Sequence, residues 1–109
     1  MRSRVYVAGP MAPRNHNILR GIQTGMHLIR AGYAPLIPHL THYTQQYGWF
    51  PLATWLEVDL PWVSQAHAVL RLEGPSRGAD AETALAQSLG IAVFTDIHDL
   101  FQTLPRIQA

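Results

Sequence analysis

Two acidic side chains stand where they could act on a sugar. Glu82 lies in the second turn of a predicted helix, directly after a loop of small residues at 74–78. Asp59 borders the apolar side of another predicted helix, on which Trp55, Val58 and Trp62 are expected, and an unpaired charge is costly to bury there; the plainer reading is an exposed aspartate on that helix. Two carboxylates flanking a sugar are what glycosidic cleavage requires, one to attack the anomeric carbon and one to handle the proton.

Four of the other acids have structural explanations. Asp96 and Asp99 stand where a helix is expected to begin, and such acids cap the helix or complement its dipole. Asp80 lies in a first turn and has the same explanation. Glu57 is two residues from Asp59 and therefore points to a different side of its helix. Asp59 and Glu82 remain as the pair of interest.

The loop at residues 74–78 joins a predicted strand at 66–72 to a predicted helix at 79–89. Free N–H groups at a helix start favour an anion, so this arrangement is typical of a phosphate or sugar site. A single glycine-rich turn is also an ordinary connection between a strand and a helix. A second such unit is expected at the N-terminus, where a strand at 5–8 runs through Gly9 and Pro10 into a helix at 14–31.

The remaining pattern predicts an α/β fold of the flavodoxin or Rossmann-like type. We expect a strand at 33–37, a helix at 51–66 bent or interrupted by Pro61, a strand at 91–94 and a helix at 96–104. Strands that alternate with helices favour a parallel sheet with helices on both faces, in the strand order 2-1-3-4. Its ligand crevice lies between strands 1 and 3, where the two unusual loops would converge.

Composition restricts the function classes. The chain has 109 residues, 48% of them hydrophobic, which suits a single domain spanning 1–109. The net charge is +1 without a basic run, so no nucleic acid polymer is expected as a partner. No apolar run is long enough to span a membrane, and a cytoplasmic protein is the default expectation. All eight basic residues are arginine, which excludes a Walker-type lysine and Schiff-base chemistry.

A metal pair is the rival use of two acids. His39 and His42 have a loop spacing without the partner residues of a recognised zinc motif, so they do not support one. We therefore expect no metal and no other cofactor.

Three motifs together carry a resemblance to a known family. They are YVAGP at 6–10, DLPW at 59–62 followed by AHAV at 66–69, and PSRG at 75–78 ending in Glu82. In this order and spacing the chain resembles the nucleoside 2-deoxyribosyltransferase superfamily, which includes the 2'-deoxynucleoside 5'-phosphate N-hydrolases and small uncharacterised relatives. The resemblance runs from about residue 4 to residue 94.

The resemblance implies a role for each matching residue. Glu82 would be the nucleophile that forms a covalent glycosyl-enzyme, and Asp59 the acid/base partner for the leaving base. Tyr6, at the end of the first strand, would hold Glu82 or the sugar through its hydroxyl, or else be a plain strand aromatic. The residues expected to bind the substrate and its phosphate are Gly9, Pro10, Ser76, Arg77 and Gly78.

Ser76 distinguishes two branches of the superfamily. Transferases that use free nucleosides usually carry an aspartate six residues before the nucleophile, whereas the phosphate-specific hydrolases carry serine. A serine beside helix N–H groups accepts a phosphate that an aspartate would repel. The resemblance therefore implies cleavage of a nucleoside 5'-monophosphate, with deoxyribosyl transfer as the variant. Arg77 and Arg14 could add charge there or be ordinary surface arginines.

Some features depart from the family. His67 stands where the family often has an acid, and the C-terminus lacks the asparagine-containing tail of the transferases, which weakens the transferase reading. A non-catalytic nucleotide-binding or signalling module, or a phosphohydrolase, remains an alternative. The aromatic segment at 42–50 would be a lid over the base or a subunit interface. The resemblance and the small core favour a homo-oligomer, a dimer or larger.

Overall fold

The protein folds into one four-stranded sheet with helices around it. The computed structural model describes residues 1–107. Strands and helices alternate along the chain as expected, with two short helical segments after the second strand. The elements are β1 (Arg4–Ala8), α1 (Arg14–Arg30), β2 (Ala34–Leu36), η1 (Pro38–Leu40), α2 (Thr41–Thr44), α3 (Leu52–Val63), β3 (Ala68–Arg71), α4 (Arg77–Ser88), β4 (Ala92–Phe94) and α5 (Ile97–Thr103).

The sheet confirms the predicted topology. Its strands are parallel and lie in the order β2-β1-β3-β4. The central strand β1 pairs with both β2 and β3, so that Tyr6 stands opposite Leu36 on one side and Val69 on the other. Tyr6 is thus in the middle of β1 rather than at its end, where we had expected it.

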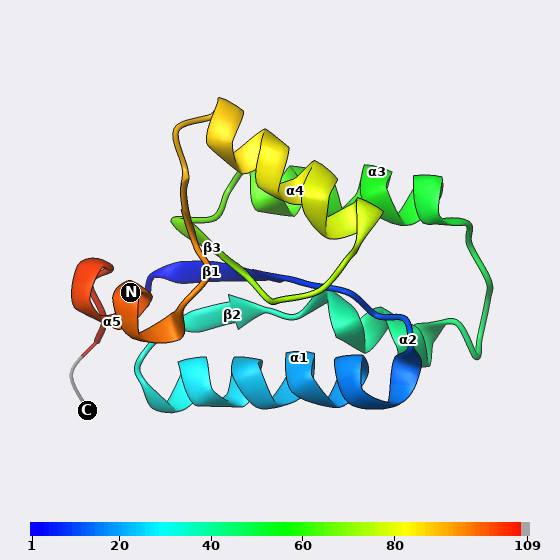
Figure 1. The fold of residues 1–109 in the computed structure, drawn as a ribbon, viewed down its shortest axis with the longest axis horizontal. Helices are drawn as coiled ribbons and strands as arrows, with labels where there is room; N and C mark the ends of the chain where they lie inside the picture. Colours follow the sequence, from blue (N-terminus) through cyan, green and yellow to red (C-terminus); the bar gives the residue numbers. More distant parts are fainter. Residues whose placement is uncertain (108–109) are drawn as a thin grey trace.

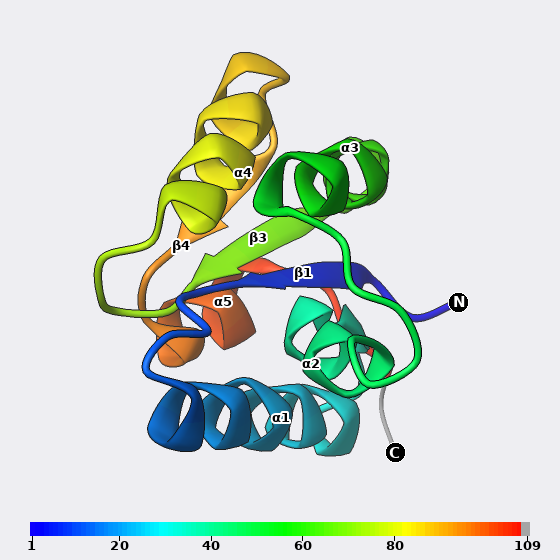
Figure 2. The ribbon, with the colours of Figure 1, turned by 90° about the vertical axis from the view of Figure 1, so that its right-hand side faces the viewer.

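Helices cover both faces of the sheet. Figures 1 and 2 show α3 and α4 on one face and α1 and α5 on the other. Successive side chains of a strand point to opposite faces, which divides the core into two clusters. Tyr6, Ala8 and Val69 pack on the α3–α4 side, while Val5 and Val7 pack on the α1–α5 side. This alternation turns the Tyr6 side chain toward α4.

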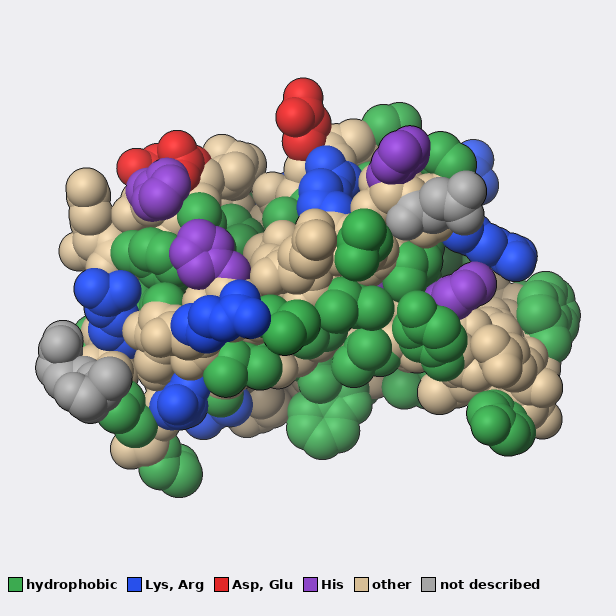
Figure 3. Space-filling view, turned by 90° about the horizontal axis from the view of Figure 1, so that it is seen from below, with side chains coloured by type: hydrophobic (Ala, Val, Ile, Leu, Met, Phe, Trp, Pro, Cys, Tyr) green, Lys and Arg blue, Asp and Glu red, His purple; other side chains and the backbone are tan. Residues whose placement is uncertain are grey.

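Figure 3 shows the face below the sheet in the view of Figure 1, where hydrophobic side chains form a band with arginine and histidine side chains beside it. Leu19, Met26 and Ile29 of α1 contribute exposed apolar surface.

Within residues 1–107, no helix is both long enough and apolar enough to cross a membrane.

The loops after β1 and β3 lie against each other at the carboxyl edge of the sheet. The Leu72 amide donates to the Ala8 carbonyl at 2.7 Å. A Cβ on Gly9 would stand 2.9 Å from the Leu72 Cβ, so the absence of a side chain at Gly9 permits this approach. Gly74 has φ +119°, a conformation that other residues rarely adopt. The predicted convergence of the two loops is therefore present.

Two helices differ from their predicted bounds by two or more residues at one end. Helix α4 begins at Arg77 rather than 79, because Ser76 caps it by accepting from the Ala79 amide at 3.1 Å. Helix α3 ends at Val63 rather than 66, and it passes through Pro61 without interruption. Proline removes the hydrogen bond that would reach the carbonyl of Glu57, a residue exposed to water, which makes Pro61 tolerable there.

The predicted apolar side of α3 was rotated relative to the observed one. Val58 and Trp62 were expected to face the core, but they are 47% and 59% exposed. Asp59 and Val63 face inward instead. The misplacement arises because α3 is apolar around most of its circumference, so periodicity alone does not select one face.

Candidate active site

A cavity of about 750 Å³ opens at the carboxyl edge of β1 and β3. Its walls come from the loop after β1, the start of α1, the segment from α2 to α3, and the start of α4. Seven of the eight residues predicted for the site line it: Gly9, Pro10, Asp59, Ser76, Arg77, Gly78 and Glu82. The eighth, Tyr6, lies behind Glu82 in the core. Residues far apart in the sequence therefore meet at one cavity.

Glu82 forms the buried floor of this cavity. Glu82 is 5% exposed, and its carboxylate accepts a short hydrogen bond from the Tyr6 hydroxyl through Oε2. Tyr6 is 1% exposed and fixed in the central strand, so it supplies a rigid donor. Glu82 reaches this position because it is six residues after the helix cap, one and a half turns along α4, on the face toward β1.

Asp59 approaches the same cavity from α3. It is 9% exposed and lies with Val63 on the inner face of that helix. The exposed position considered in the sequence analysis is therefore not the one that the structure shows. Two buried acids from different helices face one cavity, with the Tyr6 hydroxyl near both.

Burial sets the protonation of these acids. Desolvation raises the pKa of Glu82 to about 7. The hydrogen bond from Tyr6 lowers this pKa, the Asp59 charge raises it further, and the Arg71 charge lowers it. Desolvation likewise raises the pKa of Asp59 to about 6, while Tyr6 lowers it. Burial and both acids raise the pKa of Tyr6, so its hydroxyl remains a proton donor. Acids titrating near neutrality in a cavity are typical of functional sites.

The other end of the cavity suits an anion. Arg77 and Gly78 occupy the first turn of α4, where backbone N–H groups lack acceptors within the helix. The Ser76 oxygen is already engaged by the Ala79 amide, which leaves its O–H free to donate. Arg77 and Arg14 are exposed side chains that line the cavity. Donors and positive charges are thus collected at one end and carboxylates at the floor.

Comparison with known protein families identifies the family to which the chain belongs. A family described as a domain of unknown function, DUF4406, matches residues 3–95. The chain belongs to this family. Searches of the curated proteins and of the solved structures found no match. The matched range of the DUF4406 domain covers all four strands and every residue of the candidate site.

Two glycines of this DUF4406 domain line the cavity and differ in whether packing would allow a side chain. At Gly9 a side chain would clash with Leu72, as described above. A Cβ on Gly78 would meet Leu52 and Leu56 at 3.7 and 3.8 Å, which is ordinary contact. Packing therefore does not exclude a side chain at Gly78, whereas a ligand close to the first turn of α4 would.

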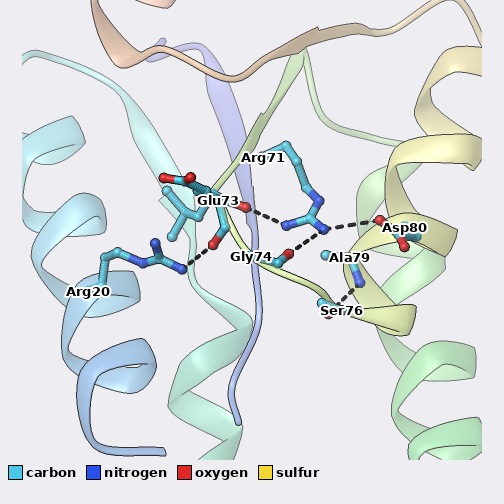
Figure 4. Close-up of polar contacts among 8 residues, drawn as sticks. Arg20, Arg71, Glu73, Gly74, Ser76, Ala79 and Asp80 are labelled. Atoms are coloured by element: carbon cyan, nitrogen blue, oxygen red, sulfur yellow. Dashed lines mark hydrogen bonds and ion pairs between the residues drawn. The ribbon is translucent and has the colours of Figure 1, made fainter. Parts of the chain in front are cut away.

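Arg71 is a residue of the site region that sequence reasoning missed. Its guanidinium donates to the carbonyls of Leu72 and Gly74, the latter at 2.9 Å, and pairs with Asp80 at 3.0 Å (Figure 4). It thereby ties the loop after β3 to the start of α4. Asp80 has this role in addition to its expected place in the first turn. The available signal was an arginine at the end of an apolar strand, directly before the loop.

The loop contact of Arg20 and the burial of His39 were also missed by sequence reasoning. Arg20 reaches from α1 to the Glu73 carbonyl at 2.5 Å, as Figure 4 shows, and so supports the same loop from the other side. His39 is fully buried against α1, where a Cβ on Gly21 would stand 2.3 Å from the imidazole. Burial lowers the pKa of His39. Its burial follows from the glycine facing it, which a reading of the histidines alone does not reveal.

Two further observations concern the remaining histidines and metal binding. His67 accepts a hydrogen bond from the Arg4 amide at 2.8 Å through Nδ1, directly before β3, and so has a structural role at the strand end. Within residues 1–107, no three His, Asp or Glu side chains are grouped as metal ligands would be. The chemistry available at the cavity is that of two carboxyl groups, a phenol hydroxyl and a helix start with free backbone N–H groups.

Proposed function

We propose that this protein cleaves the N-glycosidic bond of a nucleoside 5'-monophosphate through a covalent intermediate on Glu82. The buried Tyr6–Glu82 hydrogen bond at the floor of a cavity that Asp59 also lines carries this proposal. A carboxylate held rigidly by one donor keeps its other oxygen available for attack. The resemblance to the nucleoside 2-deoxyribosyltransferase superfamily assigns the same roles to the same residues.

The first step breaks the bond between sugar and base. The Glu82 carboxylate attacks the anomeric carbon and forms an ester with it, while the electron pair of the C–N bond leaves with the base. Asp59, protonated, gives its proton to the base nitrogen. Tyr6 orients Glu82 and remains protonated throughout, consistent with its raised pKa.

The second step releases the sugar phosphate. Asp59, now ionised, removes a proton from a water molecule, and that water attacks the anomeric carbon and frees the Glu82 carboxylate. Retaining glycosidases use two carboxyl groups in this way. If a second base takes the place of water, the same intermediate gives deoxyribosyl transfer.

The two pKa values make the reactive form a minority species. With pKa values of about 7 for Glu82 and about 6 for Asp59, the commoner form at about pH 6.5 has Glu82 protonated and Asp59 ionised, and only a small part of the molecules carries ionised Glu82 and protonated Asp59 together. The two acids interact, so each of these values describes the pair more than either group alone. A carboxylic acid with a pKa near the working pH is an efficient proton donor.

The anion-binding end supports a phosphate on the substrate. With the sugar over Glu82, a 5'-phosphate would lie toward Ser76 and the first turn of α4. The Ser76 hydroxyl and two free backbone N–H groups can donate to it, and no carboxylate stands among the residues from 75 to 79. Arg77 and Arg14 add positive charge at the cavity.

Chromatography of reaction products tests the proposal. The protein is incubated with a panel of ribo- and deoxynucleoside 5'-monophosphates and the corresponding free nucleosides, and free base and sugar phosphate are quantified. We expect base release from monophosphates only. Glu82→Gln preserves size and a hydrogen bond with Tyr6 but cannot attack, so turnover should fall at least about a thousandfold while nucleotide binding persists.

The other outcomes each identify a different function. Base exchange among free nucleosides indicates a transferase. Phosphate release without base identifies a phosphohydrolase. Nucleotide binding with no turnover by the wild-type protein favours the non-catalytic module. An unchanged rate in Glu82→Gln contradicts the assignment of the nucleophile.

A further inference from the structure

The segment between α2 and α3, residues 45–50, forms one rim of the cavity. Gln45, Gln46 and Trp49 of this segment line the cavity. Trp49 is nevertheless 74% exposed. A large aromatic side chain that faces both a cavity and solvent has a flat apolar surface without a protein partner.

Gln45 closes this segment into a loop. The Phe50 amide donates to the Gln45 Oε1 at 3.0 Å, and the Gln45 Nε2 donates to the Phe50 carbonyl at 3.4 Å. Gln45 is half-buried, whereas the side chains from 46 to 50 are exposed. One side chain thus engages both backbone groups of Phe50.

The Gln45 backbone is itself anchored. Its amide donates to the Thr41 carbonyl at 3.1 Å, at the end of α2. In the described part of the chain, no backbone group of residues 48–50 bonds to another backbone group. The Gln45 side chain therefore supplies the polar contacts that hold this part of the rim.

Phe50 is fixed on a second side by Trp55 of α3. The two rings meet edge to face with centroids 5.7 Å apart. Trp49 precedes Phe50 directly, so any movement of Phe50 moves Trp49. Gln45 and Trp55 together determine where the Trp49 ring stands relative to the cavity.

We propose that Gln45 is a positioning residue that holds Trp49 at the cavity rim as a stacking surface for the planar base of the substrate. Aromatic side chains serve nucleobases in this way because both have flat, apolar faces. A sugar phosphate alone has no such face. The inference rests on the proposed function only in that the substrate carries a base.

Calorimetric binding with and without the base tests the stacking role. Measurements use the Glu82→Gln protein, which should not consume its ligand, with a nucleoside 5'-monophosphate and with ribose 5-phosphate. Gln45→Met keeps the length and neutrality of the side chain but removes both hydrogen bonds. We expect this variant to raise the Kd of the nucleotide about tenfold, because the rim loses two neutral hydrogen bonds. The Kd of ribose 5-phosphate should stay within about twofold of its value without the Gln45→Met change.

Two further variants complete the design. Gln87→Met makes the same replacement on the exposed side of α4 and should change neither Kd. Trp49→Ala should weaken nucleotide binding as Gln45→Met does. Because both act on one surface, the double variant should be little worse than Trp49→Ala alone.

Hydrogen exchange of the Phe50 amide, followed by NMR, reports on the clamp without any ligand. We expect protection in the wild type and in Trp49→Ala, and loss of protection in Gln45→Met. Equal exchange in all three proteins overturns the clamp. Equal weakening of nucleotide and ribose 5-phosphate overturns the stacking role.

The remaining outcomes separate this inference from the proposed function. Nucleotide binding that Gln45→Met leaves unchanged overturns the role of Gln45 and leaves the proposed function standing. Failure of the wild-type protein to bind either compound overturns the proposed function and the stacking role together, while the exchange of the Phe50 amide still decides whether the clamp exists.

Discussion

At the scale of single residues, the candidate site is defined by acids held in an apolar setting. Glu82 and Asp59 are both buried, and each has a pKa well above its usual range because burial disfavours the charged form. Tyr6 donates to Glu82 without removing that cost. Such a site is unfavourable for stability, and that property can be measured whether or not a substrate is known.

Glu82→Gln should stabilise the protein at high pH. The pKa of Glu82 rises from 4.5 to about 7 on folding, so the native state holds a proton that the unfolded state has lost between these values. Stability is therefore reduced as pH rises through this window, by about 3 kcal/mol at pH 8. Glutamine avoids this loss. Urea denaturation should show the variant to be more stable by about this amount at pH 8 and by little at pH 4.5.

A matched control separates this pH-dependent effect from a gain in stability that any Glu-to-Gln replacement would give. Glu57→Gln makes the same replacement at an exposed acid of α3, and a surface substitution of this kind should change stability by less than about 0.5 kcal/mol. If Glu82→Gln has the same stability advantage at pH 4.5 and pH 8, the raised pKa of Glu82 is wrong.

At the scale of elements, the loop after β3 is held from both sides. Arg71 and Arg20 donate to carbonyls at residues 72–74, and α4 begins immediately afterwards with its own cap at Ser76. These contacts place the first turn of α4, and with it Glu82, relative to the sheet. The ion pair of Arg71 with Asp80 is a smaller part of this arrangement because Asp80 is largely exposed.

Arg71→Met should therefore destabilise the protein more than Asp80→Asn. The first variant leaves two loop carbonyls without their charged donor, and we expect a loss of about 2–3 kcal/mol. The second removes only a solvent-exposed partner, for a loss below about 1 kcal/mol. Urea denaturation measures both. Equal losses would show that the ion pair, rather than the loop carbonyls, is the important contact.

At the scale of the whole molecule, the outer side of α3 is an apolar helical surface. Val58 and Trp62 are each about half exposed there. Apolar surface of this kind on a small domain is typical of subunit interfaces. We predict that copies of this chain associate through α3, in agreement with the homo-oligomer expected from the sequence.

Trp62→Glu should shift this association toward the monomer. A charge in the middle of an apolar interface is costly to bury, so we expect dissociation at micromolar concentration. Light scattering coupled to size-exclusion chromatography measures the mass. Leu19→Glu introduces the same charge on the exposed surface of α1, on the other side of the sheet, and serves as the control. Dissociation by Leu19→Glu alone would place the interface on α1.

The fold was predictable from the sequence because its signals are local. Glycine, proline and apolar runs mark each strand and helix, and the handedness of parallel crossovers then leaves few arrangements, of which 2-1-3-4 is the one found. The convergence of Gly9 and residues 74–78 followed from that topology. The pairing of Glu82 with Asp59 was suggested by their chemistry and by the family resemblance, and the structure brings both to one cavity.

Other features depend on contacts between distant residues and required the tertiary structure. The inward face of α3 was misjudged because that helix is apolar nearly all round, and only its packing on α4 and the sheet turns Asp59 inward and Trp62 outward. The burial of His39 depends on Gly21, and the support of the loop after β3 depends on Arg20, which reaches the Glu73 carbonyl from α1. The sequence by itself determined the order of elements and the residues capable of chemistry; the tertiary structure decided which of them are buried, since burial is a property of the neighbours that folding brings together.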